Sequence, residues 1–248
     1  MRAMVLAAGL GTRLRPLTNE WPKALVEIGG RTLLEITLKR LRGFGFREVI
    51  INVHHFADRI VDYLKVNRNF GMRIEVSREQ VLLGTGGGLK KAGWFFLENV
   101  QCAEEPFLLH NVDVISTIDF GAMVEAHKKK KALATLAVQG RDSSRQLLFD
   151  EELRLCGRHA GRQGKAEVVR ASENLQTLAF TGIHVISPRL ITLMSEDGAF
   201  SIIDTYLRLA RQGESVQGYR ADEFYWRDLG KPEQLRQAEE DCRRGLFT

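Results

Sequence analysis

The sequence has little cysteine and lacks long apolar runs. Its 248 residues include three cysteines, Cys102, Cys156 and Cys242, which stand far apart with no paired spacing. This predicts neither a zinc site nor a disulfide framework, and an odd number of thiols favours a reducing compartment. No apolar run approaches the roughly 18–20 residues of a membrane span, and the start lacks a signal-peptide cleavage pattern. We therefore expect a cytoplasmic protein without a membrane segment.

The charge balance excludes little but points to an anionic partner. Lys and Arg total 36 against 31 Asp and Glu, a net charge of +5, which suits an anionic substrate without demanding nucleic acid. The densest basic run, Lys128 to Lys131, has no aromatic or further basic cluster beside it, so we interpret it as the solvated end of a helix. With 44% hydrophobic and 27% charged residues, the chain is typical of one globular domain over residues 1–248.

The pattern of the first half predicts an α/β fold. Apolar runs of strand length alternate with segments of helical period, which is typical of βαβ units and a mainly parallel sheet flanked by helices. The strands are expected at Ala3–Ala8, Val49–Val53, Ile74–Ser77, Phe107–Asn111 and Leu133–Val138. The helices are expected at Leu33–Arg42, Ala57–Val66, Pro188–Met194, Ile202–Arg211 and Pro232–Arg244, with a strand edge at Tyr225–Leu229.

The segment from Ser143 to Gln176 departs from this pattern. Glycines divide it into short apolar stretches, which predicts short strands or loops. We interpret residues 143–185 as part of a small substrate-facing subdomain of the same domain.

The strongest local signal is a buried strand that runs into Gly9 and Gly11. Such a turn presents backbone N–H groups to an anion, because glycine allows close approach. A dinucleotide fingerprint needs a third glycine where Leu14 stands and an acidic residue where Asn52 and His54 stand, and a Walker A loop needs Gly-Lys-Ser/Thr, which is absent. Two cations follow instead, Arg13 and Lys23, on a proline-stiffened segment, which favours a triphosphate or pyrophosphate.

Two further elements complete the candidate site. The glycine run from Leu83 to Gly88 precedes a short helix expected from Leu89; it is either a plain flexible loop or a place where a flat ring lies on the backbone while Thr85 offers a hydroxyl. Asp113 stands at the end of a buried strand and Asp228 at the end of the strand edge, so both stand where Mg²⁺ ligands face phosphates in open α/β sheets. For either aspartate alone, a capping role is the alternative.

Taken in order, these motifs resemble the sugar-1-phosphate nucleotidyltransferases over nearly the whole chain. The matching segments are Gly9-Leu10-Gly11-Thr12-Arg13-Leu14-Arg15-Pro16-Leu17-Thr18 with Pro22-Lys23, Leu83-Gly84-Thr85-Gly86-Gly87, Asn111-Val112-Asp113 and Trp226-Arg227-Asp228-Leu229-Gly230. The chain looks most like the short members without a C-terminal β-helix, such as mannose-1-phosphate guanylyltransferase-like proteins and N-acetylmuramate-1-phosphate uridylyltransferases.

The resemblance implies a glycosyltransferase-A-like, Rossmann-like fold and the reaction of an NTP with a sugar 1-phosphate to give an NDP-sugar and pyrophosphate. It implies that Arg13 holds the β and γ phosphates, that Lys23 lies between the α-phosphate and the sugar phosphate, and that Asp113 and Asp228 bind Mg²⁺. The remaining implied nucleotide-binding residues are Leu6, Ala8, Gly9, Gly11, Thr12, Glu79, Gly84, Thr85 and Asn111. Gly182 is expected to face the sugar.

The sequence departs from the family pattern in three places. Val112 replaces the usual glycine beside the metal aspartate, where it either shifts the backbone or fills space. The usual Glu-Lys-Pro segment near the sugar is missing, which leaves Glu167 as a candidate sugar ligand. Glu79 stands where many relatives have Gln; an ionised carboxylate only accepts hydrogen bonds, so we expect GTP or UTP rather than a cytosine base.

Two other functions remain open on the sequence. One is nucleotidyl transfer to another phosphorylated acceptor such as phosphocholine, because the NTP half of the site would look the same. The other is a catalytically silent regulatory subunit that binds a nucleotide sugar, although such a binder has no need of Arg13, Lys23, Asp113 and Asp228 together. Neither the sugar nor the oligomeric state can be predicted from the sequence.

Overall fold

The computed structural model describes residues 1–98, 105–143, 146–159 and 165–247. It divides the chain into two compact units, each made of segments that are distant in sequence. Unit 1 comprises Met1–Leu83, Leu109–Ile118 and Phe224–Thr248, and unit 2 comprises Gly84–Leu108 and Asp119–Glu223. The expectation of one domain over residues 1–248 stays a prediction.

Unit 1 is built on a sheet of strands separated by helices. Its larger elements are β1 (Arg2–Leu6), α1 (Leu33–Gly43), β4 (Glu48–Val53), α2 (Ala57–Val66), β5 (Arg73–Arg78), the end of β6 (Phe107–Asn111) and α8 (Pro232–Arg243). Its short elements are the 3-10 turns η1 (Thr12–Leu14), η2 (Lys23–Leu25) and η3 (Arg68–Gly71), and the strands β2 (Glu27–Ile28), β3 (Arg31–Thr32), β7 (Val114–Ser116) and β14 (Trp226–Asp228).

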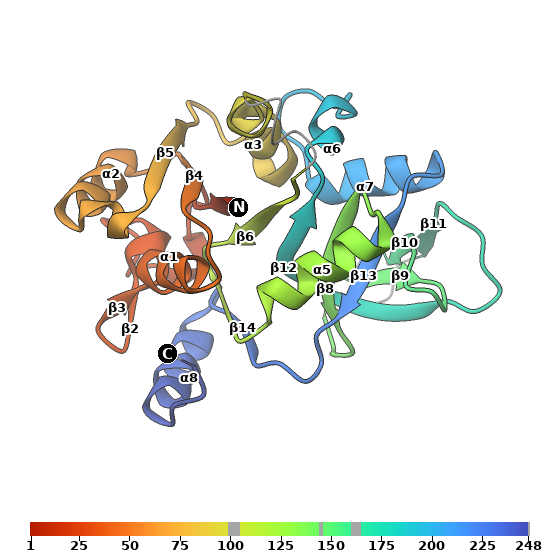
Figure 1. The fold of residues 1–248 in the computed structure, drawn as a ribbon. Helices are drawn as coiled ribbons and strands as arrows, with labels where there is room; N and C mark the ends of the chain where they lie inside the picture. Colours follow the sequence, from red (N-terminus) through yellow and green to blue (C-terminus); the bar gives the residue numbers. More distant parts are fainter. Residues whose placement is uncertain (99–104, 144–145, 160–164, 248) are drawn as a thin grey trace. The chain divides into compact units, whose positions relative to one another are not determined.

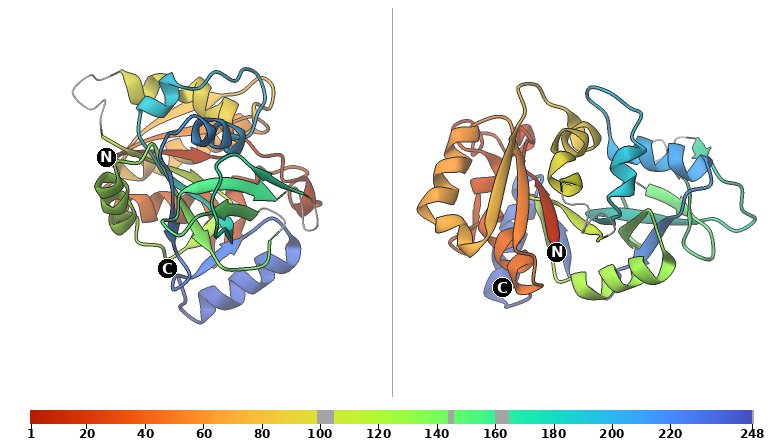
Figure 2. Two further views of the ribbon diagram at one scale, coloured as in Figure 1. Left: turned by 90° about the vertical axis from the view of Figure 1, so that its right-hand side faces the viewer. Right: turned by 45° about the horizontal axis from the view of Figure 1, so that its top comes forward.

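The sheet of unit 1 is parallel, as the alternating pattern predicted. Its order is β6-β1-β4-β5, and the register pairs Val5 with Ile51 and Ile51 with Val76. The runs of Val and Ile in β1 and β4 are buried, because helices cover a parallel sheet. The crossovers through α1 and α2 step in one direction across the sheet, so right-handed connections place both helices over the same face. Figure 1 shows them beside β4 and β5, and the right-hand view of Figure 2 shows α2 there again.

Unit 2 follows a different plan, because most of its pairings are antiparallel. Its helices are α3 (Gly84–Ala92), α4 (Trp94–Leu97), α5 (Phe120–Lys130), α6 (Arg189–Thr192) and α7 (Ile202–Arg211). Its strands are the start of β6 with β8 (Ala134–Gln139), β9 (Gln146–Phe149), β10 (Leu155–His159), β11 (Ala166–Val168), β12 (Gln176–Ile186) and β13 (Val216–Arg220). Strand β8 pairs with β13 in parallel, whereas β12 pairs with both β8 and β9 in antiparallel.

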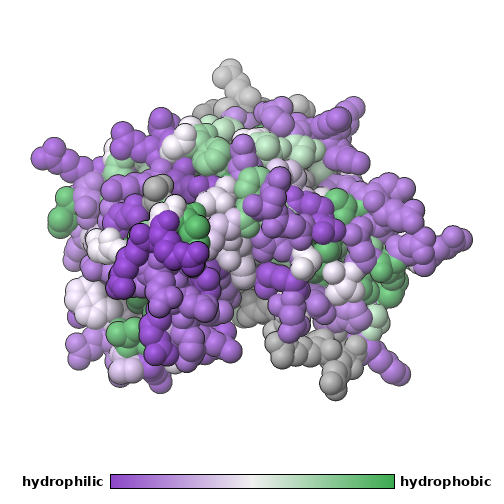
Figure 3. All heavy atoms as spheres, turned by 90° about the horizontal axis from the view of Figure 1, so that it is seen from below, coloured by the Kyte–Doolittle hydropathy of each residue, from purple (hydrophilic) through white to green (hydrophobic). Residues whose placement is uncertain are grey.

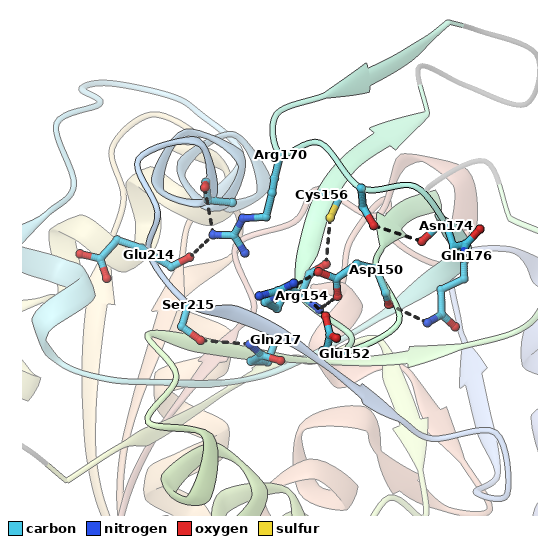
Figure 4. A network of polar contacts seen from close by, with 12 residues as sticks. Asp150, Glu152, Arg154, Cys156, Arg170, Asn174, Gln176, Glu214, Ser215 and Gln217 are labelled. Carbon is cyan, nitrogen blue, oxygen red and sulfur yellow. Dashed lines mark hydrogen bonds and ion pairs between the residues drawn. The ribbon is translucent and has the colours of Figure 1, made fainter.

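Helices and polar contacts hold the sheet of unit 2 in place. Helix α5 packs on β8 and β13, and α7 packs on β10 and β13. Figure 4 shows the polar network beside β10: Arg154 binds Asp150 at 2.6 Å, Cys156 Sγ contacts the Arg154 carbonyl, and Arg170 donates to the carbonyls of Ala210 and Glu214. The expected short strands between Ser143 and Gln176 are β9, β10 and β11, within the part of that segment that the structure describes.

The sequence predictions of helices are largely confirmed, with one correction. Helices α2 and α7 have the predicted bounds, and Lys128–Lys130 form the exposed end of α5, followed by the exposed cap residue Lys131. The glycine run, predicted as a loop before a helix at Leu89, lies inside α3 from Gly84 onward. Its small residues are needed there because a Cβ on Gly86 would lie 2.2 Å from the ring of Phe200. Tertiary packing therefore overrides the low helix propensity of glycine.

The cysteines, the surface and the helix lengths can be compared with what the composition predicted. Cys156 is buried and Cys242 is partly exposed, both as free thiols, and Cys102 lies outside the described residues. On the face shown in Figure 3, hydrophobic residues appear in small separate groups among hydrophilic ones. Within the described ranges, no helix has the length and apolar character that crossing a membrane requires.

Candidate active site

Hydrogen bonds to the Gly11 carbonyl fix the conformation of the glycine-rich turn after β1. Gly11 has φ +64°, and its carbonyl accepts hydrogen bonds from the Leu14 N–H and, at 2.8 Å, from the Thr18 hydroxyl. A Cβ on Gly11 would lie 2.9 Å from Cγ2 of Thr18, so glycine is required both for the conformation and for the space. A Cβ on Gly9 would meet nothing within 4 Å, which leaves room beside the backbone for a ligand.

Arg13 and Lys23 follow this turn in contrasting surroundings. Arg13 is exposed, and among the residues that the structure describes no hydrogen-bond or ion-pair partner for it is found. Lys23 is buried at the start of η2, and its Nζ lies 2.5 Å from Oδ2 of Asp113. The predicted phosphate ligand Lys23 and the predicted metal ligand Asp113 are thus already in contact.

The two predicted metal ligands are brought together by the antiparallel ladder of β7 and β14. Asp228 pairs with Val114, and the Leu229 N–H donates to the Asp113 carbonyl at 2.8 Å. Oδ1 of Asp228 is buried and has no hydrogen-bond partner among the described residues. A buried polar atom without a partner is costly, so this oxygen is suited to a ligand.

Gly230 explains how Arg13 reaches the same place. A Cβ on Gly230 would lie 2.6 Å from Nη2 of Arg13 and 2.7 Å from Oδ1 of Asp228. The guanidinium and the unpartnered carboxylate oxygen therefore flank the bare backbone of Gly230. Three segments of unit 1 that are far apart in sequence, around residues 13, 113 and 228, converge at this point.

Helix α8 anchors the strand that carries Asp228. Arg227 donates to Asp241 from both Nε, at 2.9 Å, and Nη2, at 2.6 Å, and the Tyr225 hydroxyl donates to the same carboxylate oxygen at 2.8 Å. Although burial opposes it, these hydrogen bonds lower the pKa of Asp241. An ionised Asp241 thus fixes β14, and with it the position of Asp228.

Val112 and His110 shape the backbone before Asp113. Val112 is buried, and its N–H donates to the Leu6 carbonyl at 3.1 Å, so of the two predicted effects the structure favours filling of space. His110 is buried one residue before Asn111, and burial lowers its pKa to about 4. It is therefore neutral at pH 7, and its Nδ1 lies 2.8 Å from the Asn111 carbonyl.

Glu79, predicted at the base edge, is tied into the protein on both sides. Its Oε1 accepts from Asn52 Nδ2 at 2.7 Å, and its Oε2 accepts from the Leu83 N–H at 3.0 Å. The side chain of Asn52 in turn accepts from the Ala7 N–H at 2.8 Å. The role of Glu79 at the base stays a prediction, but its carboxylate already has partners.

Four predicted ligand residues belong to unit 2: Gly84, Thr85, Glu167 and Gly182. The Thr85 hydroxyl accepts from the Ile202 N–H at 3.0 Å, so it helps to begin α7, and no acceptor for its own proton is found within the described part of the chain. Gly182 has φ +83° and lies at a bulge of β12. Glu167, on β11, binds Arg158 at 2.8 Å and lies near Arg211, which are contacts that a structural residue makes.

An open groove of about 450 Å³ in unit 1 lies apart from these residues. Its lining is largely apolar and contains none of the predicted site residues; it comprises Leu17, Trp21, Leu25, Val26, Glu27, Ile28, Leu235, Arg236 and Glu239. The residues predicted to bind ligands therefore do not line this groove.

Comparison with known proteins assigns the family. The model of a family described as nucleotidyl transferase matches residues 2–147, which include Arg13, Lys23 and Asp113. The chain belongs to the nucleotidyl transferase family. It is 35% identical over 243 residues to the N-acetylmuramate alpha-1-phosphate uridylyltransferase of Caulobacter vibrioides, covering 93% of this chain and 92% of that protein.

Other relatives of this nucleotidyl transferase are longer. It is 30% identical over 238 residues to a mannose-1-phosphate guanyltransferase of Yarrowia lipolytica, covering 94% of this chain but only 61% of that protein. A solved UDP-glucose pyrophosphorylase in complex with UDP-glucose superposes with a TM-score of 0.77 and 19% identity, over 98% of each chain. At that identity the similarity shows the fold alone, and the predicted α/β, Rossmann-like class is confirmed.

Sequence reasoning missed three residues of this nucleotidyl transferase site. Gly230 stands inside the quoted Trp226–Gly230 motif, so its presence there was a signal, although nothing indicated that Arg13 approaches it. Thr18 closes the first motif, but its bond to Gly11 depends on the fold of the turn. Asn52 was noted only because it is not acidic, and its role depends on two partners that are distant in sequence.

Proposed function

We propose that this nucleotidyl transferase transfers a nucleotidyl group from UTP or GTP to a sugar 1-phosphate, in a Mg²⁺-dependent reaction that gives an NDP-sugar and pyrophosphate. The observation that carries the proposal is that Arg13 and the unpartnered Oδ1 of Asp228 meet at Gly230, where the neighbouring Leu229 N–H binds the Asp113 carbonyl. The choice of UTP or GTP is supported by relatives named as a uridylyltransferase and a guanyltransferase.

The reaction does not require a covalent bond between the protein and the substrate. An oxygen of the sugar phosphate forms a bond to the α-phosphorus, the bond from that phosphorus to the bridging oxygen breaks, and pyrophosphate leaves. The attacking oxygen is already an anion, so alignment and charge neutralisation matter more than a protein base. Exposed Arg13 is free to take two phosphate oxygens in a fork, and the backbone of Leu6, Ala8, Gly9, Gly11, Thr12 and Asn111 lines the nucleotide.

The residues present fit a magnesium ion. Carboxylate oxygens are ligands that Mg²⁺ prefers, and Oδ1 of Asp228 is buried without a hydrogen bond to lose. Asp113 and Asp228 would hold the ion, which when bound neutralises charge on the phosphates. Lys23 now compensates the charge of Asp113. We assign to Lys23 a second position, on the α-phosphate and the sugar phosphate, once Asp113 holds the ion.

The sugar side of the site is assigned less completely. In unit 2 we propose Gly182 beside the sugar and Gly84 with Thr85 at the base, through backbone groups and the free proton of the Thr85 hydroxyl. The ion pairs of Glu167 with Arg158 and Arg211 favour a structural role for that carboxylate. We also place the protein in the cytoplasm, the compartment that holds nucleoside triphosphates.

The test is pyrophosphate release in the presence of Mg²⁺, with four NTPs against a panel of sugar 1-phosphates. We expect one active pair with UTP or GTP, and loss of that activity in both Asp113→Ala and Asp228→Ala. Silence across the panel, while nucleotide still raises the melting temperature, would replace the proposal with another phosphorylated acceptor, such as phosphocholine, or with a regulatory binder. Preference for CTP would overturn the choice of base.

A further inference from the structure

A buried chain of hydrogen bonds, here called the relay, links the residues that precede the two glycine-rich segments. It begins at the Ala7 N–H, just before the first glycine turn, which donates to Oδ1 of Asn52 at 2.8 Å. Nδ2 of Asn52 donates to Oε1 of Glu79 at 2.7 Å, and Oε2 of Glu79 accepts from the Leu83 N–H at 3.0 Å, just before Gly84. Asn52 is 2% exposed and Glu79 is 5% exposed, so water competes little for these bonds.

The two ends of the relay determine the chemistry of its middle. Both ends are backbone donors, so Asn52 must turn its oxygen toward Ala7 and its NH₂ toward residue 79. Residue 79 then meets a donor on each side and must accept on both oxygens. A carboxylate does this, whereas a glutamine has one acceptor and would leave two donors facing each other. The relay therefore requires a carboxylate rather than an amide at position 79.

The backbone on either side keeps the Glu79 side chain pointed inward. The Glu79 N–H donates to the Val53 carbonyl at 2.8 Å, and the Glu79 carbonyl lies 2.9 Å from Nδ1 of His54. A residue fixed at its backbone and at both carboxylate oxygens has little freedom to follow a ligand.

We propose that Asn52 and Glu79 are positioning residues, which set the backbone of Ala7 and Leu83 for nucleotide binding, and that Glu79 does not itself select the base. This inference rests on the proposed function, because it assumes that the segments after Ala7 and Leu83 bind nucleotide. Asn52 becomes a residue on which nucleotide affinity depends without contact with the nucleotide.

The relay can be rebuilt with its carboxylate at the other end, which gives a sharp test. In the double variant Asn52→Asp with Glu79→Gln, the new carboxylate at position 52 accepts from the Ala7 N–H and from the new amide at position 79. The oxygen of that amide in turn accepts from the Leu83 N–H. Net charge and hydrogen bonds are those of the wild type. Each single variant leaves one mismatch, two facing donors in Glu79→Gln and two facing acceptors in Asn52→Asp.

The measurements are the melting temperature of the free protein and calorimetric binding of Mg·UTP and Mg·GTP without sugar phosphate. We expect each single variant to melt lower and to bind nucleotide about tenfold more weakly, and the double variant to return within about twofold of the wild type with the same base preference. The control for the substitution itself is Asn67→Asp, at a residue whose amide donates to the Tyr63 carbonyl at 2.8 Å.

Two results would overturn the inference. If the double variant binds as weakly as Glu79→Gln, or shifts its preference toward CTP, Glu79 reads the base directly. If the melting temperatures show no coupling between positions 52 and 79, the relay does not set the backbone. A wild-type protein that binds no nucleotide would instead refute the proposed function, while the melting temperatures would still decide whether the relay exists.

Discussion

The charged side chains beside Gly230 in unit 1 and those around β10 and α7 in unit 2 differ in whether they have partners. In unit 2, Arg154 binds Asp150, Arg158 binds both Glu167 and Asp204, and Arg208 binds Glu196. In unit 1, Oδ1 of Asp228 lacks a partner within the described part of the chain, as does the guanidinium of Arg13.

This difference distinguishes charged groups that stabilise the fold from charged groups that can still bind a ligand. Two of these pairs in unit 2 join helix α7 to β10 and to the loop before α7, and the other two join residues around β10 to their neighbours, so their interaction energy is already used within the fold. The groups at Gly230 hold opposite charges close together and have hydrogen-bonding capacity left over. A phosphate with a bound metal ion complements both groups, because its oxygens can bind the Arg13 guanidinium and its metal ion can bind the Asp228 carboxylate. We therefore expect charge substitutions beside Gly230 to affect turnover, and substitutions of these pairs in unit 2 to affect at most stability.

The largest effect is expected from Asp228→Asn. An amide holds a divalent cation poorly, so turnover should fall on the order of 10²–10³-fold. Stability should change by less than about 0.5 kcal/mol, because Oδ1 has no hydrogen bond to lose. Pyrophosphate release and urea denaturation measure the two quantities.

The matched variant in unit 2 is Asp204→Asn, which removes the charge that pairs with Arg158 at 2.6 Å. That pair is partly exposed, so its loss should cost less than about 1 kcal/mol and leave turnover within about twofold. Normal turnover in Asp228→Asn, or a large loss in Asp204→Asn, would break the comparison between the units.

Arg13→Ala should have the next largest effect. Without the guanidinium fork, kcat/KM for the NTP should fall about 10²-fold, and Arg13→Lys should recover only part, because an ammonium is a point charge. Arg154→Ala, which removes a surface arginine paired with Asp150 in unit 2, is the control and should keep kcat/KM within about twofold. Equal losses in Arg13→Ala and Arg154→Ala would show that stability, rather than phosphate binding, is being measured.

The sequence could predict what depends on local pattern. The period of α2 and α7, the buried strands β1 and β4, and the aspartates that follow strands are all local signals, and their positions agree with the structure.

Features that depend on distant partners could not be predicted in this way. The ladder of β7 and β14 joins two strands that lie more than 100 positions apart. Each strand has three residues, which is too short to show a hydrophobic periodicity. The helix over Gly84–Ala92 is stable because Phe200 packs where side chains would stand. The orientation of the Asn52 amide is decided by the Ala7 N–H. In each case the missing information is a contact between remote segments rather than a propensity.

Acid should destabilise both units, because each contains a buried histidine whose pKa is lowered. Burial lowers the pKa of His110 in unit 1 and of His127 in unit 2 to about 4. In the unfolded chain each histidine takes up its proton near the ordinary pKa of about 6.5. The free energy of unfolding therefore has its full value above pH 6.5. It should fall by roughly 3 kcal/mol per histidine as the pH drops toward 4.

Urea denaturation between pH 7.5 and 4.5 measures this slope. His110→Gln and His127→Gln should each remove about half of the histidine contribution to it. A slope that neither variant changes would assign the acid sensitivity to the carboxylates instead, among them Asp241, whose lowered pKa acts in a more acidic range.

Lys23→Met tests the contact between the buried ammonium and the metal ligand. Because Lys23 compensates Asp113 at 2.5 Å, it competes with a cation for that carboxylate. Without nucleotide, the variant should bind Mn²⁺ about tenfold more tightly than the wild type, by the removal of a neighbouring positive charge. Lys90→Met, which removes the ammonium bound to Asp197 in unit 2, should leave Mn²⁺ binding unchanged. Equal Mn²⁺ affinity in Lys23→Met and the wild type would mean that the cation does not use Asp113.

The smallest effect is expected from Glu167→Gln, which asks whether unit 2 contributes a charge to the sugar site. Arg158 keeps its bond to Asp204 when Glu167 is neutralised, so the loss of stability should stay below about 1 kcal/mol. The KM for the sugar 1-phosphate should then change by less than about twofold. A tenfold rise in that KM at constant kcat would instead make Glu167 a sugar ligand, since uniform binding energy is lost in that pattern. In that case the ion pairs with Arg158 and Arg211 orient a binding residue, and paired charges in unit 2 serve recognition as well as architecture.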